Sequence, residues 1–203
     1  MAVTNALPQV PHLGESIRMR KIVKKFKTVA GDVTVLKGVD AEFHPGEFVG
    51  VVGKSGSGKS TLVNMLTGID KPTSGEVQIG DTLVHKLSES DRSRWRGLNL
   101  GIVFQFYQLL PVLSLLENTM LPMDIAGKIP PTEREGRALG LLRQVGLEHD
   151  AHKLPAAVSG GQQQAAAIAR ALANDPPFII ADEPTGNLDS RTAESIFSIF
   201  EGL

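Results

Sequence analysis

The feature that most constrains this chain is a glycine-rich run, Gly53–Ser60, with the sequence GKSGSGKS. It fits the pattern G-x-x-x-x-G-K-[ST], in which a loop between a strand and a helix wraps its backbone N–H groups around phosphate oxygens. The wholly apolar run 48–52 precedes the loop and is typical of a strand buried on both faces, while 59–67 favours a helix. The run therefore predicts a phosphate-binding loop rather than a flexible turn.

Each residue type in this loop has a chemical reason to be there. Glycines let the backbone turn inward, and the start of the following helix adds a positive dipole end. We expect Lys59 to reach the β- and γ-phosphates and the Ser60 hydroxyl to bind Mg²⁺. The residues expected to contact the nucleotide here are Gly53, Ser55, Gly56, Ser57, Gly58, Lys59, Ser60 and Thr61.

Two carboxylates follow a second apolar run later in the chain. The run 178–181 is typical of a buried strand, and Asp182 and Glu183 come directly after it. In phosphate-loop enzymes an aspartate at this place holds the magnesium. Because successive strand residues point to opposite faces, Asp182 can serve the metal while Glu183 serves the attacking water.

The remaining pattern predicts an α/β fold with a largely parallel sheet, because strands alternate with helices. An antiparallel β-subdomain is expected on the N-terminal side, and the consecutive helices after about residue 105 predict a helical insertion. Besides the segments above, strands are expected at 17–26, 33–43, 76–79 and 100–104, and helices at 114–125, 132–145, 159–173 and from about 196 onward.

Composition narrows the classes of function. The formal net charge is −1, so no overall field favours nucleic acid, and we expect no nucleic-acid partner. The chain has no cysteine, which excludes disulfides and thiolate metal sites. No apolar run is long enough to span a bilayer, and the first residues lack the features of a secretory signal. We therefore expect a cytoplasmic protein that reaches a membrane only through a partner.

Three further segments carry a resemblance to a known family. The run 158–164, VSGGQQQ, resembles the L-S-G-G-Q signature of ABC transporter ATP-binding subunits. The run 186–189, GNLD, resembles their D-loop, and 100–105, LGIVFQ, resembles the strand that leads into their Q-loop. The resemblance covers about 17–203, and the signature is far more specific than a phosphate loop alone.

The resemblance implies ATP and Mg²⁺ as cofactors and a head-to-tail homodimer with two composite sites. Ser159 followed by Gln162 also forms a capping box at a helix start, which is a structural role in its own right. In the family this helix start, with Ser159, Gly160, Gly161 and Gln162, closes on the γ-phosphate held by the other subunit.

Single residues take roles from the same resemblance. Gln105 would bind Mg²⁺, sense the attacking water and couple to the membrane partner, Glu183 would be the general base, and Asp189 would reach across the dimer interface. Phe26 stands where the family has an aromatic ring stacked on adenine, although a core position in a strand is the other interpretation.

The phrases 71–76, 109–111, 117–118 and 181–189 resemble the lipoprotein-release and macrolide-efflux subgroup. This resemblance implies an ATPase on the inner face of the cell membrane that powers a transporter or membrane-extraction complex through an integral membrane permease. Two alternatives stay open. One is a soluble ABC ATPase without a membrane partner, and the other is a nucleotide-binding fragment with little turnover.

Some residues depart from the family pattern. Val158 stands in place of leucine, and Ala165 stands where an arginine or lysine is usual, which we expect to weaken packing near the nucleotide. The family's γ-phosphate histidine follows the acidic strand further on, and the chain ends at Leu203, so we expect a C-terminally truncated domain with weak hydrolysis. The expected organisation is a leader at 1–16 and an ATPase domain at 17–203, with its core at about 17–105 and 174–203 and its helical part at about 106–173.

Overall fold

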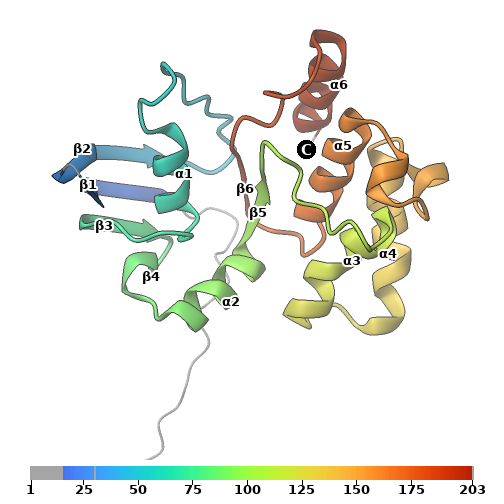
Figure 1. Cartoon of the computed structure of the whole chain (residues 1–203). Coiled ribbons are helices and arrows are strands. Elements are labelled where there is room, and N and C mark those ends of the chain that lie inside the picture. Colours follow the sequence, from blue (N-terminus) through green and yellow to red (C-terminus); the bar gives the residue numbers. More distant parts are fainter. Residues whose placement is uncertain (1–15, 30, 203) are drawn as a thin grey trace, which may run out of the picture. The chain divides into compact units, whose positions relative to one another are not determined.

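The first part of the described chain is built on an antiparallel sheet. The computed structural model describes residues 16–29 and 31–202, which form two compact units that divide after Asn99. The expected leader, 1–16, lies outside the described residues except for Ser16. Four strands of the first unit pair in the order β2-β1-β3-β4, all antiparallel (Figure 1). They are β1 (Ile17–Thr28), β2 (Gly31–Phe43), β3 (Ser74–Ile79) and β4 (Thr82–Leu83).

The register of β1 on β3 explains how this sheet makes a core. Ile17 lies opposite Ile79 and Met19 lies opposite Val77, and all four side chains are buried. Alternating residues of β1, such as Arg18, point to the other face and are exposed. The predicted antiparallel N-terminal subdomain is confirmed.

Two α-helices complete the described part of the first unit, and the sequence predicted one of them. The helix α1 (Lys59–Leu66) begins directly after the glycine-rich loop, as expected. A 3₁₀ turn (Val84–Lys86) leads into α2 (Glu89–Asn99), which the apolar pattern did not indicate. The buried face of α2 consists of Arg92, Trp95 and Asn99. Apolar residues therefore do not recur every 3.6 positions along this helix, although one of its faces is buried.

The expectation of a doubly buried strand at 48–52 is wrong in this structure. These residues belong to no strand of the described chain. The side chains of Phe48 and Val52 are 76% and 93% exposed. A strand needs a neighbour that binds its backbone, and nothing in the described pairings supplies one to this run.

The second unit combines a short parallel pair with several helices. The strands β5 (Leu100–Val103) and β6 (Phe178–Ala181) run parallel, as predicted, with Leu100 opposite Phe178. The first three α-helices of this unit match the predicted segments closely, while the last begins at Ser190, earlier than predicted. The helical part at 106–173 stays a prediction as a separate subdomain. The α-helices have the following bounds. They are α3 (Leu115–Ala126), α4 (Pro131–Gln144), α5 (Gly160–Ala171) and α6 (Ser190–Glu201), with 3₁₀ turns at Glu148–Asp150 and Pro155–Ala157.

The core of the second unit lies among α3, α4 and α5. Leu115, Met123, Leu142 and Ile168 are fully buried there. The alanines of α5 keep this helix thin, and Ala165 is buried in the same cluster with 6% exposure. The alanine at this signature-helix position therefore packs in apolar surroundings, where a long cation would have to leave the core.

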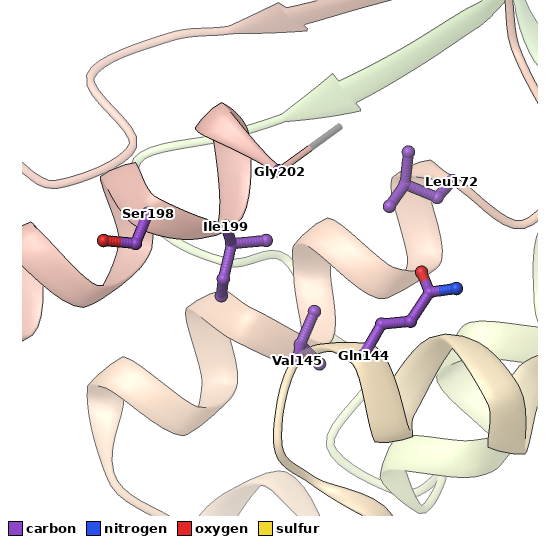
Figure 2. Close-up of a pocket in the computed structure, with 6 residues that line it drawn as sticks. All are labelled: Gln144, Val145, Leu172, Ser198, Ile199 and Gly202. Carbon is purple, nitrogen blue, oxygen red and sulfur yellow. The ribbon is translucent and has the colours of Figure 1, made fainter.

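A hollow in the second unit lies between the ends of α4, α5 and α6 (Figure 2). None of the residues predicted for a site lines it. Its walls are formed by Gln144, Val145, Leu172, Ser198, Ile199 and Gly202.

None of the helices in the described residues combines the length and apolarity that a membrane span requires.

Candidate functional site

The glycine-rich loop has the geometry of a phosphate cradle. Gly56 and Gly58 have φ angles of 76° and 99°, which L-residues with side chains rarely adopt, and Gly58 is the N-cap of α1. The N–H of Ser57 donates to the carbonyl of Lys54 at 3.1 Å and tightens the loop. The first turn of α1 carries no acidic residue that would oppose an anion.

The ammonium group of Lys59 is folded back over this loop. Its Nζ donates to the carbonyl oxygen of Gly53 at 3.1 Å and to that of Lys54 at 3.4 Å. The lysine predicted to bind phosphate therefore donates hydrogen bonds to carbonyl groups of the loop itself.

Phe26 lies on the hairpin of β1 and β2 with its ring 40% exposed. Its cross-strand neighbour Val33 is also exposed, and the Nζ of Lys24 lies 5.0 Å from the ring centroid. This exposure does not fit a core position, which was the other interpretation of the residue, and the stacking role stays a prediction.

In the second unit, the parallel pair brings the predicted polar side chains to one edge. Gln105 follows β5 and Asp182 follows β6, and the N–H of Asp182 donates to the carbonyl of Val103 at 2.9 Å. Glu183 has a left-handed backbone with φ of 46°, and its carbonyl accepts from the N–H of Gly186. Because β6 ends at Ala181, a turn rather than strand alternation sets the direction of Glu183.

The segment after Glu183 packs on Gln105. A Cβ added to Gly186 would lie 2.9 Å from Nε2 of Gln105, so the glutamine amide lies against this glycine. The amide of Asn187 also donates to the carbonyl of Gln105 at 3.1 Å. The structure therefore joins the predicted Q-loop to the predicted D-loop, through Asn187, which sequence reasoning did not select.

The predicted capping box at the start of α5 is confirmed. The hydroxyl of Ser159 accepts from the N–H of Gln162 at 3.2 Å, and the side chain of Gln162 accepts from the N–H of Ser159 at 3.0 Å. Gln162 also donates to the carboxylate of Asp150 at 2.8 Å. Three hydrogen bonds among Ser159, Gln162 and Asp150 thus fix this helix start.

Side chains of other segments approach both glycines that follow Ser159. A Cβ on Gly160 would lie 2.7 Å from the hydroxyl of Tyr107, and one on Gly161 would lie 2.3 Å from a methyl group of Thr192. Tyr107 and Thr192 carry no motif pattern, so sequence reasoning missed both contacts.

Asp189 caps the start of α6 in this chain. Its carboxylate accepts from the N–H of Thr192 at 3.1 Å and from the Thr192 hydroxyl at 2.6 Å. The side-chain hydrogen bond from Thr192, followed by the backbone one, lowers the pKa of Asp189.

Acidification is expected to fray the first turn of α6. A carboxylate whose pKa is lowered by folding contributes its full stabilisation above the pKa of the unfolded chain, and that contribution is lost as the pH falls through the folded value. NMR signals of the Thr192 amide should report the loss, and Asp189→Asn should remove this pH dependence. A midpoint at or above the ordinary aspartate pKa would contradict the capping role.

The chain is similar in sequence to proteins of a known family. A family model described as ABC transporter matches residues 36–186. The chain is 48% identical over 183 residues to the lipoprotein-releasing system ATP-binding protein LolD of Idiomarina loihiensis, covering 90% of this chain and 80% of the relative. It is 51% identical over 171 residues to an uncharacterized ABC transporter ATP-binding protein of Thermotoga maritima, covering 84% and 73%.

Two solved structures are similar to this chain throughout most of its length. One is a dimeric post-hydrolysis state of the ATP-binding cassette MJ0796 bound to ADP and Pi, with 42% identity and a TM-score of 0.85. The other is a dimeric structure of MJ0796, described as a bacterial ABC transporter cassette, with 43% identity and a TM-score of 0.85. Each comparison covers 92% of this chain and 82% of the other.

Proposed function

Because this chain belongs to the family of ABC transporter ATP-binding proteins, we propose that it is an ATP-binding and ATP-hydrolysing subunit that powers a membrane complex. The observation that carries the proposal is the formed phosphate loop, with Gly58 in a left-handed conformation at the start of α1 and Lys59 folded over the loop. A glycine-rich backbone, the start of a helix and a cation together suit a polyphosphate.

ATP binding would begin at this loop. Lys59 would leave the carbonyls of Gly53 and Lys54 and pair with the β- and γ-phosphates. The backbone of 53–58, including Ser55 and Ser57, would donate to the phosphate oxygens, and Thr61 would contact an earlier phosphate. The exposed ring of Phe26 would stack on the adenine.

The predicted metal ligands are hard oxygen donors, which is the set that Mg²⁺ prefers. The Ser60 hydroxyl would be one ligand. The carboxylate of Asp182 and the amide oxygen of Gln105, which follow neighbouring parallel strands, would be others. The bound ion would neutralise charge that develops on the phosphates during transfer.

Hydrolysis needs a water activated next to the γ-phosphate. Glu183 would accept a proton from this water as its oxygen attacks the γ-phosphorus. The bond from that phosphorus to the β,γ-bridging oxygen then breaks, which yields ADP and phosphate. Gln105 would orient the water and sense the metal.

The start of α5 would act on a second copy of the chain. Ser159, Gly160, Gly161 and Gln162 form a preorganised helix N-terminus that would close on the γ-phosphate held by the partner in a head-to-tail dimer. Asp189 would reach the same interface. The dimeric ATP-binding cassette structures support this arrangement.

The relative named for lipoprotein release supports a coupling to an integral membrane permease. The subunit would then sit at the cytoplasmic, inner face of the cell membrane through that partner. ATP would drive dimer closure, and closure would drive transport or extraction by the permease.

ATP-dependent association tests the proposal directly. Size-exclusion chromatography with light scattering should give a monomer without nucleotide and a dimer with ATP and Mg²⁺, while ADP gives less dimer. Phosphate release measured in the same buffer should accompany the ATP-induced dimer. A monomer under every condition, despite demonstrated ATP binding, would contradict the dimer-driven mechanism.

A further inference from the structure

The segment 104–108, directly after β5, is held by side chains from outside it. Four of its five carbonyl groups accept hydrogen bonds from other parts of the second unit. These bonds are Gln164 Nε2 to Phe104 O at 3.4 Å, Asn187 Nδ2 to Gln105 O at 3.1 Å, Arg170 Nη2 to Tyr107 O at 2.7 Å and Arg170 Nη1 to Gln108 O at 2.5 Å. Gln164 and Arg170 belong to α5, so the signature helix supplies three of the four.

The two carbonyls held by Arg170 lie in an unusual turn. Tyr107 and Gln108 have φ angles of 48° and 51°, and the N–H of Gln108 donates to the carbonyl of Phe106. Two consecutive residues with side chains in left-handed conformations persist only where the surroundings hold them. The planar guanidinium of Arg170 contacts both carbonyls at once, which a single-point donor does not reproduce.

The same turn places the ring of Tyr107 on the signature motif. Its hydroxyl lies 2.7 Å from the position that a Cβ on Gly160 would take. Gln105, two residues earlier, lies against Gly186. The segment 104–108 therefore lies against the predicted D-loop through Gln105 and against the first signature glycine through Tyr107.

We propose that Arg170 is a positioning residue for ATP hydrolysis, which fixes the Tyr107–Gln108 turn and so makes Gln105 and the start of α5 move together. The inference rests on the proposed function, since it gives the Q-loop and the signature motif their roles. Arg170 touches neither nucleotide nor metal in this scheme; it acts through the backbone of 104–108.

The chain contains one tyrosine, which gives a direct probe of the turn. Protein labelled with fluorotyrosine should show a single fluorine NMR resonance from Tyr107. In Arg170→Lys, which keeps the charge but loses the two-pronged contact, this resonance should shift or broaden. We expect kcat for ATP hydrolysis to fall by about tenfold, while KM changes by less than about threefold. A tenfold loss is the size expected when one hydrogen bond to a charged group is lost.

Arg137→Lys is the matched control. The Nε of Arg137 donates to the carbonyl of Ala173 at 2.7 Å, so this variant also weakens an arginine–carbonyl contact in the second unit, away from 104–108. Its resonance and kcat should equal those of the wild type. An Arg170→Lys protein with wild-type resonance and wild-type kcat would overturn the proposal, and so would a shifted resonance with unchanged kcat.

A second pair of variants does not depend on the folding of Arg170→Lys. Gly160→Ala should displace the Tyr107 ring, because the new methyl group meets the phenol oxygen. Tyr107→Phe removes that oxygen, so the loss of turnover caused by Gly160→Ala should be at least about threefold smaller in the Tyr107→Phe background. Equal losses in both backgrounds would overturn the link between the turn and the signature motif.

The outcomes separate the two proposals. Wild-type protein that binds ATP without phosphate release would overturn the proposed function, and the positioning role with it. Wild-type protein that turns over ATP, together with an Arg170→Lys variant indistinguishable from it, overturns the positioning role alone.

Discussion

Replacing Glu183 with glutamine is expected to lower ATP turnover by about 10²- to 10⁴-fold, the range of a lost general base, without loss of ATP binding. Glutamine has the same shape but does not accept the proton of the attacking water. The left-handed turn at this residue uses its backbone carbonyl, which accepts from Gly186, so the substitution keeps this hydrogen bond. The ATP-bound dimer of the variant should also persist longer, because it forms but does not hydrolyse its nucleotide.

Phosphate release and calorimetric ATP binding measure the two effects separately. Glu194→Gln, an exposed position on α6 in the same unit, is the matched control and should behave as the wild type. Turnover of Glu183→Gln within tenfold of the wild type would show that another group takes the proton.

Replacing Lys59 with methionine is expected to weaken ATP binding by about 10- to 100-fold, since charge-assisted hydrogen bonds to the phosphates are lost. The loss should be smaller for ADP, which lacks the γ-phosphate. The fold should tolerate the change, because the carbonyls of Gly53 and Lys54 that accept from the ammonium of Lys59 belong to exposed residues.

Titration calorimetry with ATP and with ADP measures both effects. Lys54→Met removes the same charge from the same loop at a position that the motif leaves open, and we expect it to change affinity by less than about threefold. Equal losses for the two variants would mean that net charge of the loop, rather than the place of Lys59, determines binding.

Features that depend on local rules were predictable from the sequence. The glycines of the phosphate loop, the capping box of Ser159 and Gln162, and the strand 178–181 all follow from short patterns with a physical cause. The structural comparison confirms the α/β fold with its antiparallel N-terminal sheet.

Features that depend on distant partners were not predictable. The helix α2 escaped detection because polar side chains fill its buried face. Arg170 and Tyr107 lie 63 residues apart in sequence, and Arg170 donates to a backbone carbonyl. Because every residue has such a carbonyl, the residue types do not reveal this contact. The run 48–52 had the composition of a buried strand, but composition does not supply the neighbouring strand.

The folded-back Lys59 has a consequence for nucleotide exchange. Two carbonyl groups of the loop, those of Gly53 and Lys54, accept hydrogen bonds from the loop's own lysine, so part of its conformational entropy is lost in folding and not in binding. Loading then requires the rotation of one flexible side chain rather than the ordering of a whole loop. Rotations of exposed side chains take place in picoseconds to nanoseconds, so the release of Lys59 from these carbonyls would add little delay to loading.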